Sequence, residues 1–254
     1  MTNASTTPRS HPRTRLLSAA RFAREALLET LWPTRCCVCD APGHLICPAC
    51  AQHLRYVDAN RACRVCGSPF GQHQCTECNE VMLAAADRER FPLDGMATPL
   101  LADDAARRIV TIYKDANERR LSREMAQMMA RCIPPEWRSA HVTFIPATAH
   151  ACRTRGFDHA ELLAREVSSA AGMEMRALLE RPRSRDQRSF GKQWRMQNMQ
   201  GCFLPKVGTT MPDEVVLVDD ICTTGATLHA AADCLRSAGI ARIFGLAFAK
   251  VLAS

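Results

Sequence analysis

The chain has 254 residues, of which 47% are hydrophobic and 23% charged, a composition typical of a globular protein with one sizeable core and a smaller accessory module. Lys and Arg outnumber Asp and Glu by 33 to 26, and the resulting net charge of +7 permits a phosphate or nucleic-acid partner without indicating one. No apolar run reaches the length of a membrane span, which argues against an integral membrane protein.

The N-terminal segment, residues 1–32, is rich in Ser, Thr and Arg and has no acidic residue before Glu25. We expect a disordered start of about 12 residues, followed by a short helix with its leucines on one face. The segment lacks the continuous apolar stretch of a secretory signal, whereas an organelle targeting peptide remains an open alternative.

The next segment, residues 33–82, contains four consecutive C-x-x-C pairs. Two thiolates separated by two residues can bind one tetrahedral metal, so four pairs predict two zinc sites with four cysteine ligands each, a double zinc ribbon. A disulfide framework is the alternative, but without a secretory signal we expect a cytoplasmic protein, in which thiols remain reduced and bind metal. The predicted ligands are Cys36, Cys39, Cys47, Cys50, Cys63, Cys66, Cys75 and Cys78.

The pairs can be shared between the two zinc sites sequentially or in an interleaved way. We favour sequential sharing, because each half of the segment ends in a helix-forming stretch, so that one unit is repeated. A site with four sulfur ligands leaves no position for water or substrate, which predicts a structural role. Cys37 is a possible substitute ligand in the first site, and the remaining cysteines lack metal-binding spacing.

From residue 94 to 254 the pattern changes to alternating strands and helices, which indicates an α/β domain with a mostly parallel sheet and helices on both faces. Two helices are expected around a break at residues 114–117, and a third at 158–171 before Gly172. Strands are expected at 141–145, 215–218 and 242–251, with a helix at 228–238.

The stretch "VVLVDDICTTGATL", residues 215–228, combines a buried strand, two acids and a loop of small and hydroxyl residues. Asp219 and Asp220 end the strand because two adjacent carboxylates cannot both be buried without partners. The loop that follows offers backbone N–H groups at the start of a helix, where an anion is favoured. This combination suits a phosphorylated sugar.

Three loops should meet at the carboxyl edge of the sheet, where ligands bind in open α/β folds. They are residues 145–159, the arginine-rich segment 181–200, and residues 219–227.

Several motifs in these loops resemble those of known proteins. "VVLVDDICTTGATL" is similar to the 5-phosphoribosyl-1-pyrophosphate (PRPP) motif of type I phosphoribosyltransferases, and "RTRGFDHAELLA" resembles the R-G-F-N-Q-A-E-L-L-A signature of the ComF family. The cysteine segment, R-P-R-x-x-x-Q from Arg181 and R-x-x-N-x-x-x-x-F from Arg195 continue the match. This chain departs from the family at Asp158 and His159, where Asn and Gln are usual.

The resemblance implies roles for individual residues. Asp219 and Asp220 would bind the ribose hydroxyls and favour the Mg²⁺ that accompanies pyrophosphate. Guanidinium groups suit phosphate oxygens, so Arg153 and Arg155 would bind the pyrophosphate, and Lys114 matches a family lysine that would reach a phosphate. The 5′-phosphate would be held by the loop residues Thr223, Thr224, Gly225, Ala226 and Thr227.

The arginine-rich segment would be the lid that covers the reaction in phosphoribosyltransferases. Its basic side chains alternate with Phe190 and Trp194, a composition that equally suits the backbone and bases of a single-stranded nucleic acid, and a charged loop without function is the third alternative. The positions that match the family here are Arg181, Arg183, Gln187, Arg195 and Asn198.

Two functions are therefore compatible with the sequence. The first is a ComF-type protein that binds PRPP and acts with DNA-uptake proteins on single-stranded DNA in natural transformation. The second is an active phosphoribosyltransferase that transfers phosphoribosyl to a nitrogen acceptor. A purely structural adaptor is disfavoured by the intact acid pair and phosphate loop.

Overall fold

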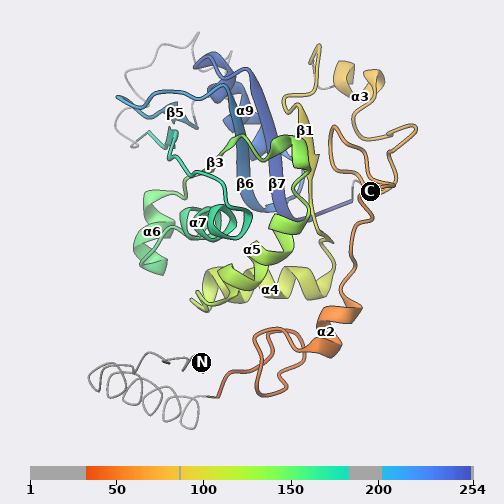
Figure 1. Cartoon of the computed structure of the whole chain (residues 1–254), viewed down its shortest axis with the longest axis vertical. Helices are drawn as coiled ribbons and strands as arrows, with labels where there is room; N and C mark the ends of the chain where they lie inside the picture. The colour runs from red at the N-terminus through yellow and green to blue at the C-terminus, as the bar shows by residue number, and fades with distance from the viewer. Residues whose placement is uncertain (1–32, 86, 183–201, 253–254) are drawn as a thin grey trace, which may run out of the picture. The chain divides into compact units, whose positions relative to one another are not determined.

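The computed structural model describes residues 33–85, 87–182 and 202–252, and Figure 1 shows the course of the chain. The chain divides into two compact units on either side of the bond between Cys50 and Ala51. The smaller unit contains the first two C-x-x-C pairs, and the larger unit contains the last two pairs together with the sheet. The two halves of the cysteine-rich segment therefore belong to different units.

A short helix follows each half of this segment, as the repeat predicted. The first is α2 (Pro48–His53) and the second is α3 (Glu80–Ala85). Pro48 begins α2 at a position where a helix makes no use of the backbone N–H that proline lacks. Before α3, the side chain of Asn79 accepts a hydrogen bond of 2.9 Å from the Met82 N–H, which satisfies one of the donors of the first turn.

The centre of the larger unit is a parallel sheet of five strands in the order β1, β7, β6, β3, with β2 also paired to β7. A separate antiparallel pair joins β4 (Leu179–Glu180) to β5 (Leu204–Pro205). The strands of the main sheet are β1 (Gly95–Ala97), β2 (Leu100–Leu101), β3 (His141–Phe144), β6 (Glu214–Cys222) and β7 (Arg242–Lys250).

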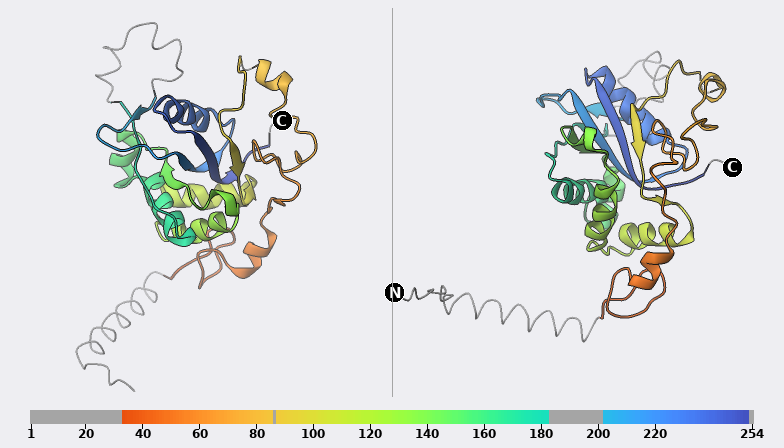
Figure 2. Two further views of the ribbon diagram at one scale, coloured as in Figure 1. Left: turned by 45° about the horizontal axis from the view of Figure 1, so that its top comes forward. Right: turned by 45° about the vertical axis from the view of Figure 1, so that its right-hand side comes forward.

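Helices cover both faces of the sheet, as Figure 2 shows. One face packs against α9 (Ala226–Ser237), and the other against α5 (Leu121–Arg131) and α7 (His159–Ala171), with α4 (Asp104–Asp115) on α5. The two inner strands are buried over most of their length, at residues 215–218 of β6 and 243–250 of β7, because a strand covered on both faces has no solvent side. The predicted fold class, a mostly parallel sheet with helices on both faces and a cysteine-rich zinc-ribbon module before it, is confirmed.

The strand that carries the acid pair is longer than predicted. β6 does not stop at Val218 but continues through both aspartates to Cys222. Its neighbour β7 runs on to Lys250, so the pairing continues with Ile221 opposite Ala249 and Cys222 opposite Lys250. Two acids can remain in the strand because backbone pairing on one side and side-chain partners, described below, satisfy them.

The break between the first two helices lies later than expected, at residues 116–120. Lys114 and Asp115 form the last turn of α4, and the reversal follows at Asn117, whose φ of 58° is a left-handed conformation that Asn tolerates better than most residues. This places Lys114 at the carboxyl end of a helix, a favourable position for a cation. Among the residues that the structure describes, none of the helices has the length and apolar character of a membrane span.

Asp158 connects helix α7 to the loop after β3. One oxygen of its carboxylate accepts hydrogen bonds from the N–H groups of Ala160 and Glu161 at 2.9 and 3.2 Å, and thus caps the helix. The other oxygen accepts a hydrogen bond of 2.8 Å from the Ala147 N–H. The loop and the helix start are therefore held by one side chain.

We expect the substitution Asp158→Ala to lower the free energy of unfolding by about 2 kcal/mol, because it removes a cap and leaves a loop donor without its acceptor. Urea denaturation measures the loss. Asp103→Ala is the matched control: Asp103 caps α4 through the Ala106 N–H at 2.9 Å, so about 1 kcal/mol should be lost there. A loss at Asp158 no larger than that at Asp103 would contradict the double role.

Candidate functional site

The eight cysteines of the C-x-x-C pairs form two groups of four. Within each group the sulfur atoms all lie within 4.8 Å of one another. The first group is Cys36, Cys39, Cys47 and Cys50, and the second is Cys63, Cys66, Cys75 and Cys78. The sequential pairing predicted from the sequence is therefore confirmed, and Cys37 belongs to neither group.

The sulfur positions fit a tetrahedral metal. Four sulfurs at the usual Zn–S distance of about 2.3 Å lie about 3.8 Å apart at the corners of a tetrahedron. The measured separations are 3.6 Å for Cys39 and Cys47, 3.6 Å for Cys63 and Cys78, and 3.4 Å for Cys66 and Cys75. Both groups thus fit a structural zinc site with four cysteine ligands.

The backbone around each group is arranged as it would be around thiolates. The Cys47 N–H donates to the Cys36 sulfur at 3.4 Å, and the Glu77 N–H donates to the Cys75 sulfur at the same distance. Gly71 leaves room for the second group, because a Cβ at this position would lie 2.5 Å from the Cβ of Cys63. Gly71 therefore allows the chain to pass close to the cluster.

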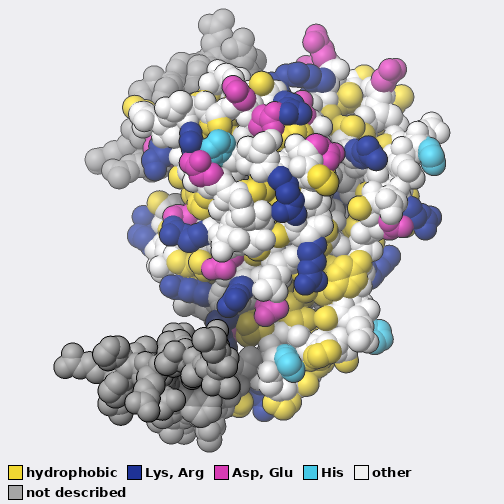
Figure 3. Space-filling view, viewed as in Figure 1, with side chains coloured by type: hydrophobic (Ala, Val, Ile, Leu, Met, Phe, Trp, Pro, Cys, Tyr) yellow, Lys and Arg dark blue, Asp and Glu magenta, His cyan; other side chains and the backbone are white. Residues whose placement is uncertain are grey.

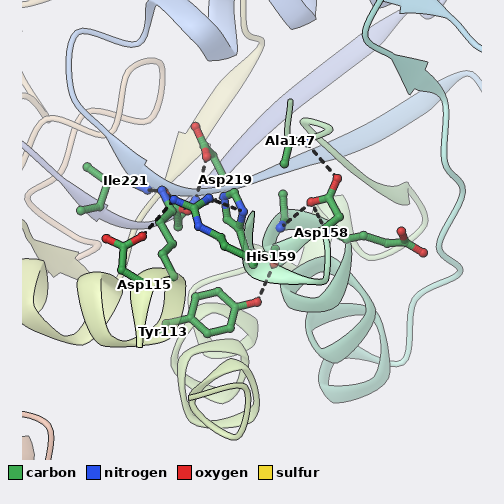
Figure 4. Close-up of polar contacts among 12 residues, drawn as sticks. Tyr113, Asp115, Ala147, Asp158, His159, Asp219 and Ile221 are labelled. Carbon is green, nitrogen blue, oxygen red and sulfur yellow. Dashed lines mark hydrogen bonds and ion pairs between the residues drawn. The ribbon is translucent and has the colours of Figure 1, made fainter. Parts of the chain in front are cut away.

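The two acids at the end of β6 point to opposite sides of the sheet. Successive side chains of a strand alternate between its faces. Asp220 contacts α4 and α7, whereas the Asp219 carboxyl points away from these helices (Figure 4). The pair therefore does not act as one unit in this structure, and each carboxylate has its own surroundings.

Asp220 is almost completely buried and is held between two basic side chains. One of its oxygens, Oδ2, lies 2.5 Å from Lys114 Nζ and 3.2 Å from His159 Nε2. The other oxygen, Oδ1, accepts a hydrogen bond of 2.6 Å from the Ile221 N–H. Burial alone would raise the pKa of Asp220, but His159 and Lys114 outweigh it and lower the pKa below its ordinary value. Asp220 therefore stays ionised.

His159 links Asp220 to the arginine of the preceding loop. Its Nδ1 lies 3.3 Å from Arg155 Nη1, and an arginine can only donate, so Nδ1 accepts and Nε2 carries the hydrogen that faces Asp220. Arg155 also contacts Asp115 at 3.0 Å, and the Tyr113 hydroxyl donates to the His159 carbonyl at 2.5 Å (Figure 4). The His159 ring is therefore held through both of its nitrogens, and its backbone is held by Tyr113.

Asp219 is partly buried, and unlike Asp220 it makes no ion pair with a cation of the described residues. Its Oδ1 accepts a hydrogen bond of 2.9 Å from the Asp220 N–H. Burial and the negative charge of Asp220 raise the pKa of Asp219 to about 7, while the more distant Lys114 and Arg181 act in the opposite direction. A cation or hydroxyl donors next to Asp219 would stabilise its ionised form.

The loop after β6 leads directly into α9. Gly225 has φ of 76°, a conformation that few other residues adopt, and a Cβ there would lie 2.9 Å from the ring of His229. Gly225 at the N-cap gives α9 no side-chain cap, and within the described part of the chain the Ala226 N–H has only a long hydrogen bond of 3.4 Å to Thr224 Oγ1, so the start of the helix can bind an anion. Thr223, Thr224, Ala226 and Thr227 are exposed around Gly225.

His229, in the first turn of α9, contacts the loop at Gly225 and holds it in place. Its N–H donates to the Gly225 carbonyl at 2.8 Å, and its ring packs edge-on against Phe91 at 4.9 Å between centroids. Burial and the nearby Arg88 lower the pKa of His229 to about 4, so the ring is neutral at physiological pH. The loop is thus supported by an uncharged ring.

The predicted arginines of the neighbouring loops have different surroundings. In the short helix α6 (Ala149–Arg155), Arg155 joins the acid network while Arg153 is exposed. Arg181 donates to the Pro146 carbonyl at 2.6 Å and lies 4.6 Å from the ring centre of Phe203. The other predicted positions, Arg183, Gln187, Arg195 and Asn198, lie outside the described residues.

Three residues of this site were not predicted from the sequence, namely Asp115, His159 and His229. The sequence did contain a hint of a role for His159, because Asp158 and His159 replace two neutral amides of the family signature. His229 gave no signal, because a histidine in the first turns of a helix is common on protein surfaces.

We expect the substitution Asp219→Asn to remove a pH dependence of stability. An acid whose pKa is raised in the folded protein stabilises it when protonated, and this contribution is lost as the pH rises through about 7. The free energy of unfolding of the wild type should therefore fall, relative to the variant, by about 1–2 kcal/mol between pH 5 and 8, less than the full shift implies because the side chain is partly exposed. Chemical denaturation at several pH values measures it, and parallel curves would contradict the assignment.

The comparisons with known proteins agree with this architecture. The double zinc ribbon domain family matches residues 27–82. Competence protein ComFC of Streptococcus pneumoniae is 25% identical over 214 residues, which cover 81% of this chain and 94% of that protein. ComFC of Bacillus subtilis is 22% identical over 227 residues, covering 88% and 89%.

Two solved structures also match part of the chain, each at 21% identity. One is described as the allosteric regulatory enzyme of purine biosynthesis, with a TM-score of 0.38 over 50% of this chain, and the other is glutamine PRPP amidotransferase from B. subtilis, with 0.37 over 49%. The chain spans about a quarter of the length of each. The chain therefore resembles the two ComFC proteins over most of its length, and its N-terminal segment matches the double zinc ribbon family and carries two four-cysteine groups.

Proposed function

We propose that the carboxyl edge of β6 binds PRPP together with Mg²⁺. The observation that carries this proposal is the direct succession of a partly buried carboxylate at Asp219, a glycine turn and the start of α9, whose N-cap residue Gly225 has no capping side chain. A carboxylate can accept from the ribose hydroxyls or bind Mg²⁺, and the helix start can bind a phosphate. A phosphorylated ribose requires both kinds of group, a carboxylate for its hydroxyls and an anion site for its phosphate.

The roles of the two acids differ in this proposal. Asp219 faces the ligand, since it is partly exposed and its nearest described cations, Lys114 and Arg181, act only from a distance. Asp220 positions the site, since its charge is already balanced by Lys114 and it accepts a hydrogen bond from His159 in a buried cluster. Lys114 and Arg155 border the same cluster and are the candidates to contact the pyrophosphate.

Chemistry at this site would need little proton transfer from the protein. Displacement of pyrophosphate passes through a cationic sugar, and it is favoured by negative charge near the ribose and by groups that bind the departing anion. Asp219 and the cluster of Lys114 and Arg155 have these charges. Transfer of phosphoribosyl to a nitrogen acceptor is therefore the second candidate function, and binding without transfer is the first.

The two four-cysteine groups bind structural zinc in this proposal. Each offers four sulfurs within 4.8 Å of one another, which completes a tetrahedral site and leaves no ligand position for a substrate.

We further propose that the protein acts in the cytoplasm on single-stranded DNA during natural transformation, with proteins of the uptake machinery. The support is that both matched relatives are named competence proteins, and that the chain carries a net charge of +7. On the face that Figure 3 shows, basic side chains are interspersed with acidic ones. The arginine-rich segment 183–200 is therefore the first candidate for the DNA contact.

If the PRPP proposal holds, Mg²⁺ and PRPP at a hundredfold their dissociation constant should raise the free energy of unfolding of the wild type by about 2.7 kcal/mol. Asp219→Asn should lose most of this gain, because the amide neither neutralises Mg²⁺ nor accepts as strongly from two hydroxyls. Thermal denaturation with and without ligand measures it.

Glu136→Gln is the matched control for that experiment. Glu136 lies in the turn η1 (Pro135–Trp137), which precedes β3 and therefore lies at the opposite end of the sheet. The control should keep the full gain, and equal gains in all three proteins, or none in the wild type, would contradict a sugar-phosphate site at Asp219.

For the DNA proposal, reversal of charge at Arg183 and Arg185 should weaken the binding of single-stranded DNA and reduce its dependence on salt, because fewer counterions are released. Binding measured at several salt concentrations tests this. Arg131→Glu, an exposed residue at the end of α5, is the control. An unchanged salt slope in the double variant would exclude this segment as the contact.

A further inference from the structure

The second four-cysteine group is joined to the sheet by a buried ion pair. Glu77 lies between the ligands Cys75 and Cys78, and its Oε2 lies 3.1 Å from Nζ of Lys250 at the end of β7. The side chains of Lys250 and Glu77 are only 7% and 16% exposed. The other oxygen of Glu77 accepts a hydrogen bond of 3.1 Å from the Ser68 hydroxyl. An ion pair so far removed from water holds its partners in place, because either charge alone would be costly to bury.

Lys250 lies next to the start of the phosphate loop. It is the register partner of Cys222 on β6, and the Val251 N–H donates to the Cys222 carbonyl at 2.9 Å. Cys222 immediately precedes Thr223, the first residue of the loop. The ion pair is therefore connected to the proposed phosphate site by the pairing of Lys250 with Cys222, the residue before the loop.

A second contact fixes the other turn of the same four-cysteine group to the edge of the sheet. The Met96 N–H of β1 donates to the carbonyl of Arg64, which lies between Cys63 and Cys66, at 3.0 Å. A Cβ at Gly67 would lie 3.2 Å from Cγ of Met96, so the turn packs closely on β1, which is paired to β7. The second four-cysteine group is thus attached to the sheet at two points, one in each of its two turns.

From these contacts we infer that the second four-cysteine group, residues 63–78, positions the phosphate loop through Glu77 and Lys250, so that zinc at this group and an anion at the loop favour each other's binding. The inference rests on the proposed function of the loop. Zinc holds the turn from Cys75 to Cys78 and thereby directs Glu77 toward Lys250; without metal, the four thiols have no common partner that fixes the turn. Glu77 and Lys250 are positioning residues, since neither belongs to the loop itself.

The first four-cysteine group provides an internal control, because it has the same ligands but belongs to the other compact unit. Cys47→Ser and Cys75→Ser should each reduce the zinc content of the full chain from two ions to one. Only Cys75→Ser should increase hydrogen exchange in residues 220–228 and weaken the binding of PRPP with Mg²⁺ about tenfold, within the usual range of coupling between sites.

Glu77→Gln separates positioning from folding, because this variant keeps all eight cysteines. It should retain both zinc ions and still weaken PRPP binding and increase exchange at 220–228. Coupling between binding affinities is reciprocal, so in the wild type PRPP with Mg²⁺ should also raise the affinity for one zinc ion, and only one, as measured by equilibrium competition with a chelator. In the Glu77→Gln variant this gain in affinity should be lost.

The hydrogen-exchange comparison needs no ligand, so it separates this inference from the proposed function. Absence of PRPP binding in the wild type would refute the proposed function, while faster exchange at 220–228 in Cys75→Ser and Glu77→Gln, but not in Cys47→Ser, would still support the positioning role. Equal exchange at 220–228 in all four proteins would overturn the inference, as would equal loss of PRPP binding in Cys47→Ser and Cys75→Ser.

Discussion

The site depends on a buried negative charge at Asp220 and on how the chain balances it. β6 carries this carboxylate into the protein interior, where it could not remain ionised without Lys114 at 2.5 Å and His159 at 3.2 Å. Those partners come from α4 and α7, so one charge connects the central strand to two helices on the same face of the sheet. Asp219, on the other side of the strand, is left with a raised pKa and with only distant cations among the described residues.

The sequence predicted the strand, the loop, both four-cysteine groups and the helices α7 and α9, because each has a local pattern of apolar residues, capping residues or cysteine spacing. It did not predict that β6 continues past the acids, since that depends on the length of β7, a neighbour in space. It also treated Asp219 and Asp220 as one functional pair. Their separation follows from the alternation of side chains along the strand and from His159, whose position depends on the packing of α7.

The two cysteine groups illustrate the same limit of local patterns. Their spacing is almost identical, and each is followed by a short helix, yet they lie in different compact units. Only the structure shows that Glu77, which resembles any other polar residue between two ligands, makes an ion pair with Lys250. A repeated motif can therefore have the same metal chemistry in both copies and a different role in each.

The most direct measurement is a crystal structure of the full chain with ribose 5-phosphate and Mg²⁺. It should show the phosphate on the N–H groups of residues 223–227 and the ribose hydroxyls, or the metal, at the Asp219 carboxylate, with Asp220 still bound to Lys114 and His159. A sugar phosphate bound elsewhere, or an empty loop at saturating ligand, would contradict a sugar-phosphate site at the end of β6.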